Sequence, residues 1–141
     1  MSYETMDKTV MPRRVGRSIA AVAAGIVAGI VLSLGTDVAL HFVGLFPALG
    51  QPMSDRLLAL ATTYRAVYSV LCSYLTARLA PRRPLLHAMV LGVLGLIVSV
   101  IGAATTWNRG LGPHWYPVAL VVLALPLSWL GGRLGELELG A

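Results

Sequence analysis

Of the 141 residues, 57% are hydrophobic and only 12% are charged, whereas about a quarter of the residues in an ordinary soluble domain are charged. So few charges exclude a protein whose surface faces water on every side. The formal net charge of +5 could suit a nucleic-acid-binding protein, but the cations stand in short clusters between long apolar runs. That arrangement is typical of the loops of membrane proteins, so we expect the lipid bilayer, and no nucleic acid, as the partner.

The apolar runs predict an all-α integral membrane protein, a bundle of four transmembrane helices. A span needs about 20 residues to cross ~30 Å of hydrocarbon, and each run is long enough. The predicted spans are residues 18–46, 55–80, 85–107 and 116–131. They form one transmembrane domain, residues 17–134, between a polar N-terminal tail at 1–16 and a C-terminal tail at 135–141.

The first span is too long for a straight helix that stands perpendicular to the membrane. At 1.5 Å per residue, residues 18–46 would extend over about 43 Å, which exceeds the ~30 Å of hydrocarbon. We therefore expect this helix to tilt, to project beyond the bilayer, or to break near Gly35.

Turn and capping residues separate the remaining spans. Ser54 predicts the N-cap of the second helix, with Asp55 in its favoured first turn. The basic turn at residues 81–84 (Pro-Arg-Arg-Pro) should end that helix. In the fourth span, Pro117 lies in the first turn, where a missing N–H costs little, but Pro126 lies inside and predicts a kink.

The distribution of Lys and Arg predicts the direction of the spans. Eight of the 11 would lie on one side of the membrane, Arg56 and Arg109 on the other, and Arg65 within a span. Because cytoplasmic loops carry the excess of positive charge, we expect both chain ends in the cytoplasm, the N-in/C-in topology. The eight are Lys8, Arg13, Arg14, Arg17, Arg78, Arg82, Arg83 and Arg133.

Residues 51–55, 63–65 and 74–81 resemble stretches of small bacterial membrane proteins. The resemblance implies a multi-pass protein of the bacterial cytoplasmic (inner) membrane, and it implies no particular activity. The chain differs from the small multidrug exporters, which carry a glutamate early in their first helix, because its first span has no acidic residue before Asp37.

Two rows of small residues recur at helical spacing in the first and third spans. The first row is Ala21, Gly25, Gly29 and Ser33, and the second is Ala88, Gly92, Gly95 and Ser99. Small side chains at this spacing let a second helix approach closely, which drives helix pairing in lipid. The rows therefore predict packing of these two helices inside the bundle, or contact with a second copy or a larger membrane complex.

Asp37, His41 and Arg65 are ionisable residues that lie well inside the predicted spans. Asp37 and Arg65 each lie about nine or ten residues from the loop that joins the first two spans, so we expect them at similar depth in the membrane. A charge inside the bilayer costs about 3 kcal/mol or more unless it finds a partner. We therefore predict an Asp37–Arg65 ion pair, with His41 one turn further out and with Tyr64 or Tyr68 supplying hydroxyl groups.

This polar cluster allows two interpretations. It can be a latch that holds the first two helices in register, or it can be part of a transport or proton-relay site, since intramembrane acids, histidines and arginines often mark ion pathways. Four short helices rarely enclose a pore alone, so transport would require an oligomer.

Nothing in the sequence indicates an enzyme, a cofactor or a metal. Cys72 lies in an apolar run and is expected to be a small buried hydrophobe. His41 and His114 lack the spacing of a metal site, and no catalytic set of residues can be assembled. We therefore expect a non-enzymatic membrane protein that associates with itself or with a larger complex, and a small oligomeric transporter or channel as the alternative.

Overall fold

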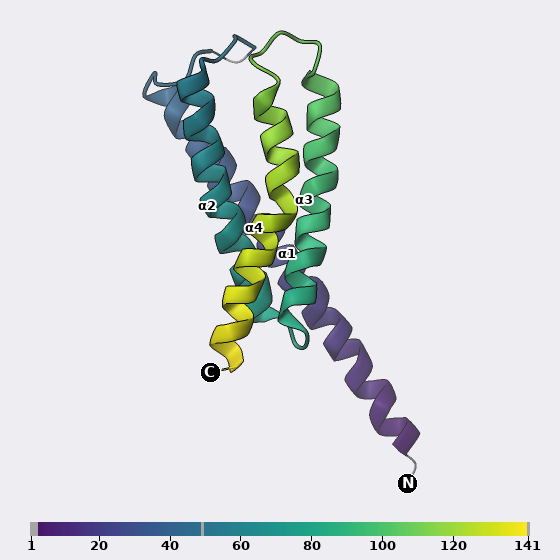
Figure 1. Cartoon of the computed structure of the whole chain (residues 1–141). Coiled ribbons are helices and arrows are strands. Elements are labelled where there is room, and N and C mark those ends of the chain that lie inside the picture. Colours follow the sequence, from purple (N-terminus) through teal and green to yellow (C-terminus); the bar gives the residue numbers. More distant parts are fainter. Residues whose placement is uncertain (1–2, 49, 141) are drawn as a thin grey trace.

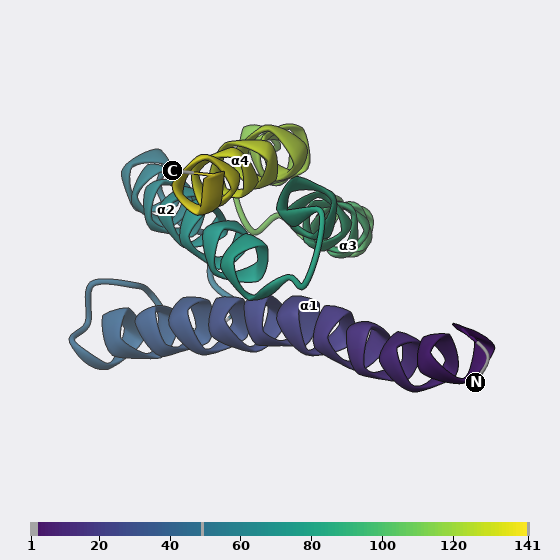
Figure 2. The ribbon, with the colours of Figure 1, turned by 90° about the horizontal axis from the view of Figure 1, so that it is seen from below.

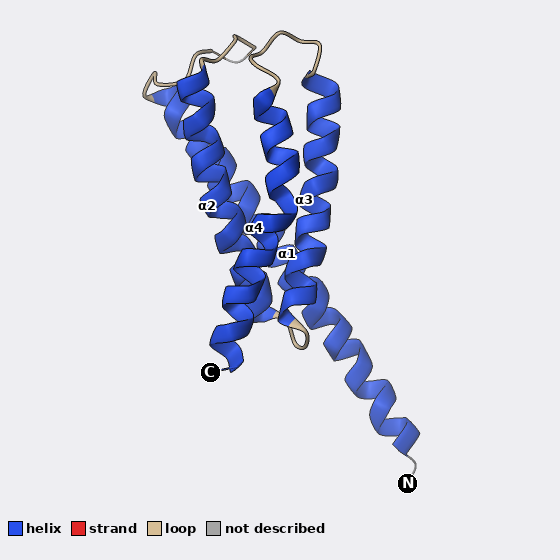
Figure 3. Ribbon diagram, viewed as in Figure 1, coloured by secondary structure: helices blue, strands red, loops and turns tan. Residues whose placement is uncertain are grey.

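The computed structural model describes residues 3–48 and 50–140, and the regular structure in these ranges is all helical. The helices are α1 (Tyr3–Phe42), α2 (Asp55–Leu79), α3 (Pro84–Thr106) and α4 (Trp115–Gly140). They run alternately in opposite directions, so the first turn of α1 and the last turn of α4 lie at the same end (Figure 1). Short loops join them (Figure 3). The predicted all-α fold is thus confirmed.

Three of these helices are long and apolar enough to cross a membrane. They are residues Val15–Phe42 of α1, together with α3 and α4, and they indicate a multi-pass membrane protein. Helix α2 has 25 residues, which is ample length, but it is not among the apolar helices. Polar residues such as Thr62, Arg65 and Tyr68 interrupt its apolar run. A fourth crossing therefore stays a prediction.

Helix α1 is a single helix of 40 residues. It continues through Gly35 without a break and begins inside the segment predicted as an N-terminal tail, part of which lies outside the described residues. It ends at Phe42 and not at residue 46, because Gly44 adopts a positive φ of 80° and the backbone N–H of Phe46 turns back to the carbonyl of Leu40 (3.1 Å). The N-terminal part of α1 projects beyond the other helices (Figure 1).

The other helix ends follow the predicted signals closely, except at the C-terminus. Ser54 caps α2 by accepting a hydrogen bond from the N–H of Leu57 (3.5 Å). Helix α3 begins with Pro84, one residue earlier than predicted. Helix α4 continues to Gly140, through most of the predicted C-terminal tail. Glu138 anchors this extension on α2, where it pairs with Arg78 (3.0 Å) and accepts from the Tyr74 hydroxyl.

Helix α4 packs most extensively, against both α2 and α3. Three glycines allow this approach. A Cβ built on Gly131 would clash with the carbonyl oxygen of Val70, and one on Gly135 would lie 2.7 Å from Ala77 Cβ. On the other side, a Cβ on Gly132 would lie 2.5 Å from Ala88 Cβ. These glycines were not among the predicted rows of small residues, although their spacing is visible in the sequence.

Helix α1 lies across one side of the group formed by α2, α3 and α4 (Figure 2). It packs mainly on α2, where the Thr76 hydroxyl donates to the carbonyl of Ala21 (3.1 Å). A Cβ on Gly25 would clash with Thr76 and lie 2.8 Å from Leu91 of α3. Among the described residues, α1 makes no backbone-level contact with α4. Helices α2, α3 and α4 therefore pack closely together, whereas much of the surface of α1 has no neighbouring helix in the chain.

Candidate functional site

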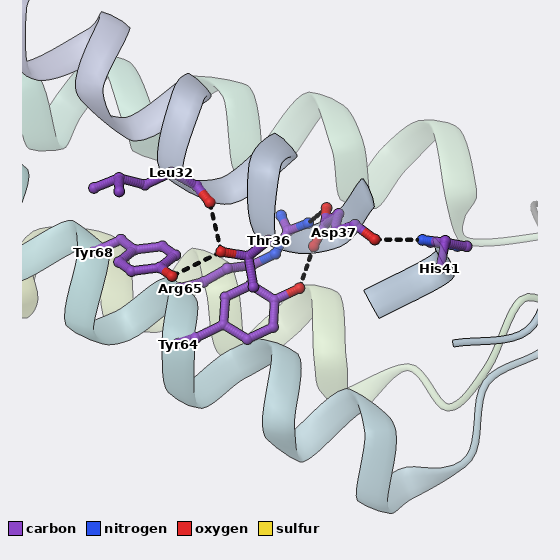
Figure 4. A network of polar contacts seen from close by, with 7 residues as sticks. All are labelled: Leu32, Thr36, Asp37, His41, Tyr64, Arg65 and Tyr68. Carbon is purple, nitrogen blue, oxygen red and sulfur yellow. Dashed lines mark hydrogen bonds and ion pairs between the residues drawn. The ribbon is translucent and has the colours of Figure 1, made fainter. Parts of the chain in front are cut away.

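Asp37 of α1 and Arg65 of α2 lie opposite one another and form an ion pair (Figure 4). Arg65 Nη2 donates to Asp37 Oδ2 at 2.5 Å, and the Tyr64 hydroxyl donates to the other carboxylate oxygen. Within the isolated chain, the Asp37 side chain is 21% exposed and the Arg65 side chain is 33% exposed. Each carboxylate oxygen thus has its own donor, which is the arrangement that makes a partly buried charge tolerable.

Tyr68 and His41 lie nearby but do not bind the Asp37 carboxylate. The Thr36 hydroxyl contacts both the carbonyl of Leu32 and the Tyr68 hydroxyl, each at 2.7 Å. Because a carbonyl only accepts, Thr36 donates to Leu32 and Tyr68 donates to Thr36. His41 Nδ1 lies 2.7 Å from the backbone carbonyl of Asp37 and not from its side chain (Figure 4).

These contacts join two successive turns of α2 to the adjacent residues Thr36 and Asp37 of α1. Thr36 was not singled out in the sequence, although it directly precedes Asp37 and carries a hydroxyl. Because the carbonyl of Asp37 can only accept a hydrogen bond, His41 Nδ1 carries the proton and donates it. The His41 and Phe46 rings meet at right angles, with their centroids 5.4 Å apart.

A cavity of about 820 Å³, here called the central cavity, lies among the four helices. Three members of each row of small residues line it, Gly25, Gly29 and Ser33 on α1 and Gly92, Gly95 and Ser99 on α3. Only the members of the rows nearest the α2–α3 loop pack tightly. A Cβ on Gly92 would lie 2.6 Å from Ser128 of α4, whereas one on Gly95 would meet nothing within 4 Å. The predicted rows therefore share one cavity instead of packing directly on each other.

Arg65 connects the ion pair with the central cavity, because it lines the cavity while it binds Asp37. Tyr68 lines the same wall.

No protein-family model, curated protein or solved structure matches this chain.

A second, smaller pocket of about 240 Å³ lies at the end of the bundle that carries the α1–α2 and α3–α4 loops. His41 and His114 both line it. The His114 ring stacks on Trp107, with centroids 4.1 Å apart, and its Nε2 lies 2.9 Å from the Trp107 carbonyl. In the described part of the chain, no group of three or more His, Cys, Asp or Glu side chains could hold a metal ion.

Proposed function

We propose that this chain is a non-enzymatic, four-span protein of the bacterial cytoplasmic membrane that associates, through its helices, with a second copy or a larger membrane complex. The observation that carries the proposal is the open side of the bundle along α1, which packs on α2 and slightly on α3 but not on α4. A helix with so few intramolecular neighbours has a large surface left for lipid or for another helix.

An unused small residue on α3 supports association over simple lipid exposure. A Cβ on Gly102 would meet nothing within 4 Å, and Gly102 does not line the central cavity. Glycine in a helix interior costs up to about 1 kcal/mol relative to alanine. Where no neighbour inside the chain uses the missing side chain, close approach of an outside helix provides a reason for it.

In the proposed topology both chain ends lie in the cytoplasm, and α2 crosses the membrane in addition to α1, α3 and α4. The 25 residues of α2 would extend over about 37 Å, and pairing of Arg65 with Asp37 lowers the cost of its charge in the bilayer. Reporter fusions after Arg82 and at the C-terminus should both show cytoplasmic activity, and a fusion after Gly110 should show periplasmic activity. A periplasmic C-terminus would contradict this topology.

Association can be tested by mass measurement in nanodiscs made directly from native membranes. We expect particles that contain more than one copy or an additional protein, and we expect Gly102→Leu to shift the population towards the isolated chain. Gly140→Leu is a matched control, because a Cβ at Gly140 also meets nothing within 4 Å but lies in the last turn of α4, away from the open side along α1. An isolated chain in native membranes would overturn the proposal.

A second candidate function is a small oligomeric transporter or channel. One observation favours it: Asp37 lies on α1 between Leu34, which lines the central cavity, and His41, which lines the second, smaller pocket. An ion pair in that position could control passage between the two spaces. Proteoliposomes with the wild type and with Asp37→Asn would test this, and the absence of flux for protons and for monovalent and cationic solutes would eliminate it.

A further inference from the structure

Three arginines lie at the end of the bundle that carries the α2–α3 loop. Arg82 and Arg83 belong to this loop, directly before α3, and Arg17 lies on α1. The loop runs beside α1 in two perpendicular views (Figure 1, Figure 2). All three residues are exposed, and they are here called the arginine cluster.

The register of α1 against α3 places Arg17 level with the loop. The two helices run in the same direction, and a Cβ built on Gly25 of α1 would lie 2.8 Å from Leu91 of α3. Arg17 lies eight residues before Gly25, and Arg83 lies eight residues before Leu91. Each arginine is therefore about 12 Å along its helix from this contact, on the same side of it.

The arginine cluster has no counter-charge among the described residues, since no ion pair joins it to a carboxylate. The two other arginines of α2 and α4 at this end are paired. Arg78 binds Glu138 at 3.0 Å, and Arg133 binds Glu136 at 2.7 Å. Positive charges that gather at one level without a counter-charge attract an anion.

A second copy of the chain would not supply this anion. Glu136 and Glu138 are already paired. Glu4 and Asp7 precede Arg17 on α1 by ten residues or more, which is about 15 Å or more along the helix. The remaining two acids of the chain lie towards the opposite end of the bundle. The counter-charge must therefore come from another molecule.

An aliphatic face of α3 begins three residues after Arg83. It consists of Leu86, Val90, Val93 and Ile97, which recur at intervals of four, three and four residues and so share one side of the helix. Each of them is between 44% and 51% exposed. Helix α3 is apolar and long enough to cross a membrane. The anion would thus lie next to a surface that suits hydrocarbon.

The positions of the arginines along the apolar segments correspond to the level of lipid headgroups. Arg82 and Arg83 directly precede α3, and Arg17 is the third residue of the apolar segment Val15–Phe42. Residues at the ends of a membrane span lie in the headgroup region. There the guanidinium group can donate two parallel hydrogen bonds to a phosphate.

We propose that the arginine cluster binds the phosphate group of an anionic phospholipid, and that the acyl chains of this lipid lie on the aliphatic face of α3. A zwitterionic lipid also carries a phosphate, but its own cation cancels that charge, so the site selects an anionic lipid. Each arginine near a membrane surface strengthens such binding by about fivefold. The site needs only one copy of the chain and does not depend on the association proposed above.

The proposal can be tested by native mass spectrometry of the full chain in a non-ionic detergent. The protein is titrated with dioleoylphosphatidylglycerol or, separately, with dioleoylphosphatidylcholine, and the apparent Kd of the first bound lipid is measured. We expect the wild type to prefer phosphatidylglycerol by about tenfold or more. Arg17→Gln should weaken the binding of this lipid by about fivefold, and Arg82→Gln/Arg83→Gln by about tenfold or more. Neither variant should change the binding of phosphatidylcholine.

Arg133→Gln is the matched control, because it removes one positive charge from the same end of the bundle but from an arginine that is already paired. It should bind phosphatidylglycerol as the wild type does, and circular dichroism of each variant verifies that the helices are retained. An equal loss in Arg133→Gln and Arg17→Gln would overturn the proposal, because it would reveal a general attraction by net charge. Equal affinity of the wild type for both lipids would also overturn it. So would displacement of phosphatidylglycerol by an excess of glycerol 3-phosphate, which would identify a water-soluble phosphate as the ligand.

Discussion

Replacing Arg65 by alanine leaves Asp37 on α1 with one donor, the Tyr64 hydroxyl, in place of two. An uncompensated charge in a buried pair costs about 3–5 kcal/mol, whereas an exposed pair contributes less than about 1 kcal/mol. The pair lies between these limits, because its side chains are 21% and 33% exposed in the isolated chain. We therefore expect Arg65→Ala to lower the free energy of unfolding by about 2–3 kcal/mol.

The double variant Asp37→Ala/Arg65→Ala should lose less, about 1 kcal/mol, since it leaves no unpaired charge behind. Reversible unfolding in mixed detergent micelles, followed by circular dichroism, measures both values. Arg56→Ala, in the first turn of the same helix, is a suitable control and should change little. Equal instability of the single and double variants would refute the argument, because the Asp37 carboxylate left without Arg65 would then carry no penalty.

Other contacts of the bundle lead to further predictions. Gly25→Ala should destabilise the protein by about 1–3 kcal/mol in the same assay, because the new Cβ would overlap Thr76, whereas Gly35→Ala should be neutral or slightly stabilising. Thr76→Val, which removes the hydrogen bond between α2 and α1, should cost roughly 1 kcal/mol. Glu138→Gln should hardly change global stability, since its pair with Arg78 is exposed, but it should speed hydrogen exchange in the last turns of α4; unchanged exchange would show that this contact does not hold the helix end.

The local signals of the sequence were sufficient for several features of the fold. Ser54 caps α2 and Pro84 opens α3, close to where the turn residues placed these helix ends. Local signals misjudged α4, because Gly131 and Gly132 do not by themselves favour a helix. Their backbones lie against α2 and α3, and this packing outweighs the intrinsic cost of glycine.

The candidate site was only partly visible in the sequence. Equal distances from a short hairpin indicated that Asp37 and Arg65 lie at the same depth, and the structure brings them together. The same reasoning could not tell which hydroxyl group reaches the carboxylate. Tyr64 does so, while Tyr68 lies one turn away on the same helix and binds Thr36. That choice depends on how α1 is rotated against α2, which distant contacts such as that between Thr76 and Ala21 determine.

Composition and periodicity by themselves determined that the chain is helical and largely apolar, because these properties reside in single residues and their neighbours along one helix. They also identified the two rows of small residues on α1 and α3. Only the tertiary structure decided what those rows do, because α3 packs mainly on α4 and α1 packs mainly on α2. As a result, Gly95 and Ser99 line a cavity and do not form the contact between α1 and α3 that their spacing suggested.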